Sequence, residues 1–320
     1  MTRVLVTGAS GFVGSYLLER MAQSGQYQVT ATGGTRQPPV DSDHEAWRWA
    51  ESWHQVDLNN LENRPGLLAA VFQQARPQAV VHLAAVSDVN QCETDPRRAT
   101  AVNVTGTEHI ARLCRQQGAH LVFLSTDYVF DGARGYYREE ERPQPTQHYG
   151  RTKWEAEQAV ARELPASSIL RTSLMYGWPV PGGHGTLATT VINQLGNGRA
   201  FCGYTDMYRS PTYVGDVVDG ILKLLSGGHP GTHHLAGPEW VNMAEFARTV
   251  AEVFRLDHRL VEPAESKGDN ASRPRLLGLN PTQTVQRLGL RLSGLITGLE
   301  QMQLEMQLER RGDSWQRKYW

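Results

Sequence analysis

Short apolar runs alternate with longer amphipathic segments through the first half of the chain. The apolar runs are typical of buried strands and cover residues 4–6, 80–83, 121–124 and 169–170. The segments between them have the spacing of helices and cover residues 12–24, 65–74, 99–117 and 149–162. Because strand and helix alternate strictly, the pattern predicts βαβ units with right-handed crossovers. We therefore expect an α/β fold with a doubly wound parallel sheet.

The second half of the chain is less regular. Residues 177–185 are rich in Gly and Pro and predict a loop, whereas helical spacing returns at 186–195, 214–225 and 240–255. These features predict a smaller C-terminal unit that lies over the carboxyl edge of the sheet. The expected division is a sheet domain (1–173, with a return segment at about 211–239), a smaller domain (174–210 and 240–300) and a helical tail (301–320).

The helical tail carries apolar residues on two faces. One face has helical spacing and consists of Leu295, Leu299, Met302 and Met306, and the second consists of Leu304 and Leu308. A helix that packs on its own domain accounts for the first face. The second face leaves a subunit contact open, as in a homodimer.

Composition limits the classes of partner. Lys and Arg number 32 against 33 Asp and Glu, and binding to nucleic acid or an anionic membrane needs a field of one sign, so neither is expected. The three cysteines are far apart and have no metal-ligand spacing, so we expect no metal site and no disulfide framework. The N-terminal apolar run is too short for a signal peptide, and no segment approaches the roughly 20 apolar residues of a membrane span. A cytoplasmic location is therefore expected.

A glycine-rich turn follows the first predicted strand directly. In the segment Thr-Gly-Ala-Ser-Gly-Phe-Val-Gly, three glycines allow a tight turn, a close approach of backbone to a pyrophosphate, and close packing of helix on strand. The phosphates would lie at the positive end of the following helix. This context predicts a dinucleotide-binding Rossmann domain, with cofactor contacts from Gly8, Ser10, Gly11, Phe12, Val13 and Gly14.

The end of the second strand indicates which dinucleotide binds. An NAD site places a carboxylate there for the ribose 2′-hydroxyl, but this chain has hydroxyls and Arg36. A guanidinium would hold a 2′-phosphate, so NADP(H) is favoured and NAD(H) is the alternative. Asp57, followed by Leu58, is expected either to bind the adenine amino group or to cap a turn.

Two later segments predict the chemistry. Thr126 and Asp127 stand at the carboxyl end of a predicted strand, where ligands bind in such sheets. Tyr149 and Lys153 lie four residues apart and share one face of a predicted helix. A nearby ammonium group favours ionisation of a tyrosine, so Tyr149 can deliver a proton to a carbonyl oxygen that Thr126 also binds. Lys153 can in addition hold the nicotinamide ribose.

The motifs TGASGFVG, HLAAVSDVNQCE, NVTG, STDYVFDG, YGRTK, LRTSLMYG and SPTYVGDV together resemble the extended short-chain dehydrogenase/reductases. Within them the chain is most similar to the dTDP-4-dehydrorhamnose reductase family, which also includes the regulatory β subunit of methionine adenosyltransferase. The resemblance covers residues 3 to about 300 and implies reduction of the 4-keto group of a nucleotide-linked deoxysugar with NADPH or NADH. It implies a Thr126, Tyr149 and Lys153 triad.

The resemblance also implies further contacts and shows departures. Ala84 and Ala85 match the chain that passes beneath the cofactor, and Asn103 matches an asparagine behind the active site. The family usually has Val-Asp where this chain has Val-Asn at residues 89–90, and its Trp-rich segment before the third strand is atypical. These departures bear on the identity of the sugar and leave the reduction chemistry unchanged.

Other functions fit parts of the pattern. Dehydratases of the superfamily carry Asp-Glu after the active-site Thr, but here Tyr128 follows Asp127. An epimerase would keep the same Tyr/Lys pair, and an NADP-binding regulatory subunit of a partner enzyme would retain the fold with little catalysis. Arg209, with Thr212 nearby, is expected either to bind a substrate diphosphate or to form a structural salt bridge.

Overall fold

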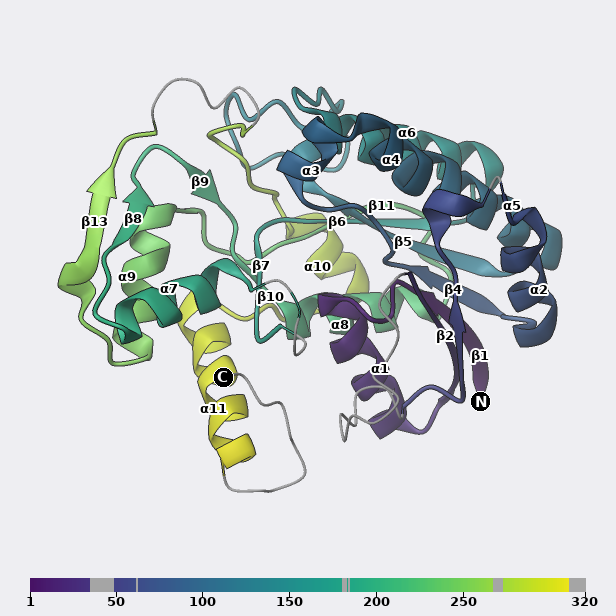
Figure 1. The fold of residues 1–320 in the computed structure, drawn as a ribbon, viewed down its shortest axis with the longest axis horizontal. Helices are drawn as coiled ribbons and strands as arrows, with labels where there is room; N and C mark the ends of the chain where they lie inside the picture. The colour runs from purple at the N-terminus through teal and green to yellow at the C-terminus, as the bar shows by residue number, and fades with distance from the viewer. Residues whose placement is uncertain (35–48, 62, 180–182, 184, 267–272, 311–320) are drawn as a thin grey trace.

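A computed structural model describes residues 1–34, 49–61, 63–179, 183, 185–266 and 273–310. Its centre is a seven-stranded parallel sheet with the strand order β11-β6-β5-β4-β1-β2-β3 (Figure 1). The strands are β1 (Thr2–Thr7), β2 (Tyr27–Gly33), β3 (Ser52–Gln55), β4 (Ala79–His82), β5 (His120–Thr126), β6 (Ser168–Thr172) and β11 (Gly231–Leu235). The order reverses between β1 and β4, as in a Rossmann sheet, so the predicted fold class is confirmed.

Helices cover both faces of the sheet (Figure 1). The first layer consists of α1 (Phe12–Ser24) and α8 (Val214–Leu225), and the second of α2 (Pro65–Ala75), α5 (Thr107–Gln117) and α6 (His148–Glu163). Side chains alternate along β1, so Val4 and Val6 pack in the core with α1 and α8, whereas Leu5 packs in the core with the second layer. This burial on both faces explains why the strands read as continuous apolar runs.

The helix predicted over residues 99–117 is wrong in detail. Residues 99–117 consist of the end of α4 (Pro96–Thr100), a π-helical segment η3 (Ala101–Gly106) and then α5, and a further short helix, α3 (Val89–Thr94), precedes them. Asp95 caps α4 by accepting a hydrogen bond from the backbone N of Arg98, and Pro96 occupies its first turn. The wider π turn, which is frequent at functional sites, contains Asn103.

A second core lies beside the sheet domain. It is built mainly from α7 (Leu187–Gly196), α9 (Met243–Val253) and α11 (Leu295–Arg310). The short strand pairs around it are β7 (Met175–Tyr176) with β10 (Thr212–Tyr213), β8 (Phe201–Tyr204) with β13 (Val261–Ala264), and β9 (Tyr208–Arg209) with β12 (Val241–Asn242). Helix α10 (Thr282–Leu288) and the 3-10 turns η2 (Leu58–Asn60), η4 (Asp127–Val129) and η5 (His258–Leu260) complete the described elements.

Helix α9 begins later than predicted, at Met243 rather than near residue 240. Asn242 and Glu245 form a capping box, which fixes the start. In α11, the predicted inner face packs as expected, since Leu295, Leu299 and Met302 are buried in the second core. Among the described residues, no helix is long and apolar enough to cross a membrane.

Candidate active site

A cleft of ≈ 660 Å³ opens at the carboxyl ends of the central strands. Its walls come from the glycine turn, the ends of β2 and β3, the chain after β4, the end of β5 and the start of α6. Most residues predicted for cofactor and catalysis line it, namely Gly8, Ser10, Gly11, Phe12, Val13, Gly14, Asp57, Leu58, Ala84, Ala85, Thr126, Asp127, Tyr149 and Lys153. The structure thus brings together segments that are more than one hundred residues apart.

The glycine turn leaves no room for side chains at its first and third glycines. Gly8 has a φ of +70°, and a Cβ there would lie 2.5 Å from the backbone N of Ala84. A Cβ on Gly14 would lie 2.5 Å from the backbone O of Ala9. The turn therefore requires glycine for its conformation and for close packing against the chain after β4. Helix α1 begins at Phe12 with its amino end at the cleft, which fits a bound pyrophosphate.

The expected adenine side of the cleft is described in part. Asp57 lines the cleft, and its carboxylate accepts a hydrogen bond of 3.0 Å from the backbone N of Asn59. The capping role is thus present, and the predicted adenine contact stays a prediction. Leu58 is buried beside it. Arg36, the predicted 2′-phosphate contact, lies outside the described residues.

Asn103 supports the cleft from behind rather than lining it. Its Oδ1 accepts a hydrogen bond from the backbone N of Val86 (2.8 Å), and its Nδ2 donates to the backbone O of Val86 (3.0 Å) and to the hydroxyl of Thr152 (3.0 Å). The side chain is 1% exposed. Asn103 therefore connects the chain after β4 to the helix that carries the Tyr/Lys pair, and its predicted cofactor contact stays a prediction.

Thr126 and Tyr149 meet at the base of the cleft. Thr126 ends β5, and Tyr149 lies in the first turn of α6, which Gln147 caps by accepting a hydrogen bond of 2.6 Å from the backbone N of Gly150. The phenol ring packs edge-on against Tyr128. Burial raises the pKa of Tyr149, and a hydrogen bond with the Thr126 hydroxyl lowers it in part. The phenol thus keeps its proton at neutral pH, as a proton donor requires.

Lys153 is buried beneath the same site. Its Nζ donates a hydrogen bond of 2.7 Å to the backbone O of Leu124 and lies 4.0 Å from the ring centroid of Phe123. Burial lowers the pKa of Lys153 to about 7, although the carboxylate of Glu157 opposes this shift. The ammonium group therefore titrates within the physiological range.

Three residues outside the predicted site form a buried polar cluster next to Lys153. Glu157 accepts a hydrogen bond of 2.5 Å from Ser125 and a bidentate ion pair from Arg171, at 2.6 Å for the closest contact. Ser125 precedes Thr126 at the end of β5, and Arg171 lies on β6. The signal available in the sequence was the spacing of Lys153 and Glu157, which places them one helical turn apart.

Asp127 is buried at the edge of the cleft. Its Oδ2 accepts a hydrogen bond of 2.6 Å from the Ser173 hydroxyl. Burial raises the pKa of this carboxyl, and the guanidinium of Arg209 lowers it in part. The predicted substrate contact of Asp127 stays a prediction that its place in the cleft supports.

Arg209 and Thr212 do not line the cleft. The guanidinium of Arg209 donates hydrogen bonds to the backbone oxygens of Tyr208, Pro274 and Arg275, at 2.7–3.0 Å. The Thr212 hydroxyl is likewise paired, with Ser210 and Gly237. Both residues therefore have a structural role, and Arg209 performs it through backbone oxygens instead of the salt bridge that was one expectation. Binding of a substrate diphosphate by Arg209 stays a prediction.

The cleft has one wall that the predicted site did not include. Ser87, Val89, Arg98 and Val102 line it opposite the glycine turn. Arg98 and Val102 are four residues apart along the helical segment, so they share a face. Asp95 fixes the start of α4 and thereby the direction of this face. The predicted helix began at residue 99, which placed Arg98 before the helix rather than on a face shared with Val102.

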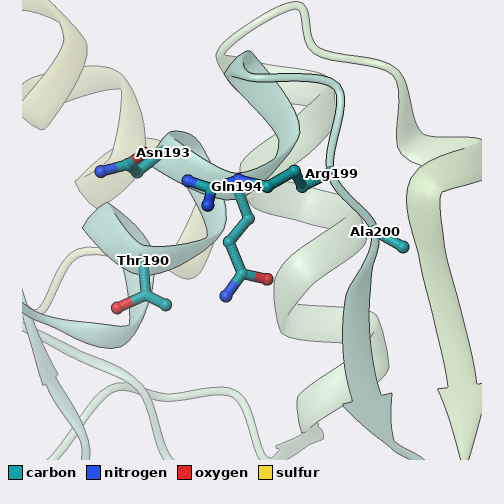
Figure 2. Close-up of a pocket in the computed structure, with 5 residues that line it drawn as sticks. All are labelled: Thr190, Asn193, Gln194, Arg199 and Ala200. Atoms are coloured by element: carbon teal, nitrogen blue, oxygen red, sulfur yellow. The ribbon is translucent and has the colours of Figure 1, made fainter.

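A second, shallow hollow of ≈ 360 Å³ lies on α7 and the following turn. Figure 2 shows Thr190, Asn193 and Gln194 projecting from the helix, with Arg199 beside them and Ala200 just before the next strand. It shares no lining residue with the cofactor cleft and contains no acid, histidine or tyrosine. It therefore offers no acid–base chemistry of its own. Within the described residues no group of three or more His, Cys, Asp or Glu could hold a metal ion.

Curated relatives include proteins named as reductases and a subunit of methionine adenosyltransferase. The chain is 32% identical over 290 residues to the probable low-salt glycan biosynthesis reductase Agl14 of Haloferax volcanii, covering 89% of this chain and 91% of the relative. It is 29% identical over 281 residues to the methionine adenosyltransferase 2 subunit beta of Bos taurus, covering 85% and 78% respectively.

Solved structures and the family comparison agree with the geometry. A dTDP-4-dehydrorhamnose reductase from Bacillus anthracis in complex with NADP is similar with a TM-score of 0.79 and 26% identity, covering 95% of this chain and 99% of that one. Residues 1–307 match the RmlD substrate binding domain. The likeness thus extends across the sheet domain, the cleft and the second core, and this chain belongs to the RmlD substrate binding domain family.

Proposed function

We propose that this chain is an NADPH-dependent reductase that acts on the 4-keto group of a nucleotide-linked deoxysugar. The observation that carries the proposal is the presence of Thr126, Tyr149 and Lys153 in one cleft with the glycine turn. Membership of the RmlD family supports it, as do relatives that are named as reductases. NAD(H) is the alternative cofactor.

The chain's own residues would perform the proton chemistry. The bound dinucleotide supplies a hydride for the keto carbon. Tyr149 holds a proton at its phenol oxygen because burial raises its pKa, and it gives this proton to the carbonyl oxygen as negative charge develops there. The Thr126 hydroxyl donates a hydrogen bond to the same oxygen. Lys153, held by the backbone O of Leu124, stabilises the phenolate that Tyr149 becomes.

The second core would hold the sugar nucleotide. We assign residues 1–173, with a return segment at about 211–239, to the cofactor domain, and 174–210 and 240–300 to the substrate domain. The separate hydrophobic core around α7, α9 and α11 supports this division. Ser173 and Met175, which stand where the two parts join, line the cleft.

The direct test is NADPH oxidation, followed by absorbance, with a panel of dTDP- and UDP-linked 4-ketosugars. We expect turnover with at least one member and loss of turnover in Tyr149→Phe. NADPH binding without turnover across the panel would contradict the reductase. Absence of NADPH binding would contradict the cofactor assignment as well.

The relationship to methionine adenosyltransferase 2 subunit beta favours one other function, an NADP-binding regulatory subunit with little catalysis. The same assay separates the two, because a regulatory subunit would bind NADPH, remain silent across the panel and alter the activity of a co-purified enzyme. An epimerase would instead interconvert sugar nucleotides without net oxidation of added NADPH.

Assembly and location complete the proposal. Leu304 is 49% exposed and Ile296 57% exposed on α11, which suits a homodimer contact. Sedimentation of the purified protein tests this, with Leu304→Lys as the disrupting variant and a monomer at all concentrations as the contradicting result. A cytoplasmic location is proposed and is tested by fractionation of the cells that produce the protein.

A further inference from the structure

A buried histidine contacts two segments that adjoin the cofactor cleft. His82 ends β4 and is 0% exposed. Its Nδ1 lies 2.6 Å from the hydroxyl of Thr7, which directly precedes Gly8 in the glycine turn. Its Nε2 lies 2.9 Å from the hydroxyl of Thr107, the first residue of α5. The imidazole therefore contacts the turn on one side and the helical layer on the other.

The directions of these hydrogen bonds follow from counting protons. Thr107 has one hydroxyl proton and donates it, at 2.6 Å, to the backbone O of Asn103, which can only accept. Towards His82 the Thr107 oxygen can then only accept, so Nε2 carries a proton. A neutral ring leaves Nδ1 unprotonated, and Nδ1 accepts the proton of Thr7.

The surroundings exclude the charged ring. Burial, together with the ammonium group of Lys153, lowers the pKa of His82 to about 3. The Phe123 ring stacks on the imidazole, with centroids 5.5 Å apart, and Lys153 Nζ lies 4.0 Å from the centroid of the same phenyl ring. A cationic His82 would thus repel the ammonium of the Tyr/Lys pair across one aromatic ring.

The chain of hydrogen bonds continues from His82 to both functional segments. Thr107 holds the backbone O of Asn103, and the Asn103 side chain holds Val86 on the cleft wall and Thr152, the neighbour of Lys153. At the other end, Thr7 leads into Gly8, whose backbone touches Ala84. One ring therefore connects the pyrophosphate side of the cleft with the segment that supports the nicotinamide side.

We propose that His82, as the neutral Nε2–H tautomer, is a positioning residue that fixes the glycine turn relative to the Asn103 segment and so preorganises the cleft for the dinucleotide. The inference rests on the proposed function for its consequence, since it assumes that the cleft binds NADPH. The tautomer itself does not depend on the cofactor. Its role acts through Thr7 and Asn103, since His82 does not line the cleft.

Two conservative variants at Thr107 test the role without removing the ring. Thr107→Val keeps the shape but leaves Nε2–H without an acceptor, and Thr107→Ser keeps the hydroxyl. We expect Thr107→Val to raise the Kd for NADPH about tenfold, equivalent to about 1.4 kcal/mol, and Thr107→Ser to stay within about twofold of the parent. At saturating NADPH, kcat of Thr107→Val should equal that of the parent, because bound NADPH restores the position of the glycine turn relative to the Asn103 segment. An unchanged Kd in Thr107→Val would overturn the proposal.

A matched control separates positioning from general stability. His233 on β11 is also buried and hydrogen-bonds a backbone oxygen, that of His229, but it does not line the cleft or join this chain of bonds. His233→Phe should lower the melting temperature and leave the Kd for NADPH unchanged. An equal loss of affinity in His233→Phe and Thr107→Val would reduce the effect to stability and overturn the proposal.

The tautomer is tested by long-range ¹H–¹⁵N correlation spectra of the ¹⁵N-histidine-labelled protein without cofactor. The chain has 11 histidines, and the signals absent from the His82→Phe spectrum assign the ring. We expect a protonated Nε2 and an unprotonated Nδ1 at pH 7. A protonated Nδ1 would overturn the assignment. If the parent protein bound no NADPH while this tautomer was observed, the proposed function and the role of His82 in cofactor binding would fail, and the tautomer assignment would stand.

Discussion

Lys153 on α6 donates a hydrogen bond of 2.7 Å from its Nζ to the backbone O of Leu124, near the end of β5. This bond holds the lysine under the residues that follow on the strand, which end in Thr126. Because Tyr149 is one helical turn earlier on α6, the same contact sets the distance between the phenol and the strand end. The predicted triad is therefore a geometric unit fixed by one helix and one strand.

Replacement of Tyr149 by Phe should remove the proton donor and leave the shape of the cleft. We expect kcat to fall by about a hundredfold or more, with the Kd for NADPH nearly kept. Steady-state kinetics and fluorescence titration measure the two quantities. The matched control is Tyr136→Phe, since Tyr136 is 39% exposed and does not line the cleft. Normal turnover in Tyr149→Phe would remove the phenol from the mechanism.

Activity should depend on pH through Lys153. Its lowered pKa of about 7 means that the ammonium form is complete below this value and is lost as the pH rises through it. We expect kcat/KM to be level below about pH 7 and to fall roughly tenfold per pH unit above it. A profile that stays level to pH 9 would show that the charge of Lys153 is not required.

The position of that fall should depend on Glu157. Its carboxylate raises the pKa of Lys153, so Glu157→Gln should move the fall in kcat/KM to lower pH. Glu155→Gln, an exposed substitution on the same helix, should leave the profile unchanged.

Circular dichroism checks that Glu157→Gln is folded, because the change leaves Arg171 without its buried partner. If it is unfolded, the parent profile still decides the role of Lys153. A folded Glu157→Gln protein with the parent profile would contradict the coupling.

The cofactor turn and the Tyr/Lys pair could be predicted because each is local in sequence. Gly8 to Gly14 follow a strand directly, and Tyr149 and Lys153 share one helical turn, so neighbouring residues determine both features. The parallel sheet with helices on both faces follows from the alternation of strand and helix. The order of the strands, with β11 at the edge beside β6, was not predicted. For the glycine turn and the Tyr/Lys pair, the local sequence pattern was sufficient for the prediction.

Other features depend on contacts that spacing does not encode. Strands β8 and β13 pair across about sixty residues, and β7, β9, β10 and β12 have two residues each, too few for a period to be read. Arg171 and Glu157 form their ion pair only because β6 packs under α6 in the folded protein. Arg209 was expected at a diphosphate or in a salt bridge, but the fold directs its donors to backbone oxygens near residue 275. Such outcomes require the tertiary structure.

Arg98 should contribute to cofactor binding. It lines the cleft opposite the glycine turn and forms no ion pair with another described residue. We expect Arg98→Gln to raise the Kd for NADPH about five- to tenfold, with a smaller effect at high salt because the side chain is exposed. An equal loss of affinity for NADH would indicate that Arg98 contacts the pyrophosphate. A loss of affinity confined to NADPH would indicate that it contacts the 2′-phosphate.

Arg97→Gln is the control, since Arg97 is exposed on the same short helix and does not line the cleft. Equal affinities of the Arg98 and Arg97 variants would contradict the contact.

Acid should destabilise the protein through its buried histidines. Burial lowers the pKa of His82 and His234 to about 3, and also lowers those of His120 and His233. In the unfolded chain these groups take up protons near pH 6.5, so between pH 6.5 and 3 the folded protein binds fewer protons and its stability falls as the pH falls.

The slope of this loss is measurable by urea unfolding between pH 7 and 5. His82 and His234 should each contribute about 1.4 kcal/mol per pH unit below about pH 6. His82→Phe should therefore give a shallower slope than the parent, whatever its effect on absolute stability, whereas His258→Gln, at an exposed position, should keep the parent slope. Equal slopes in the parent and in His82→Phe would mean that His82 accepts a proton in the folded state, which its hydrogen bonds to Thr7 and Thr107 do not accommodate without reversal of the Thr7 hydroxyl.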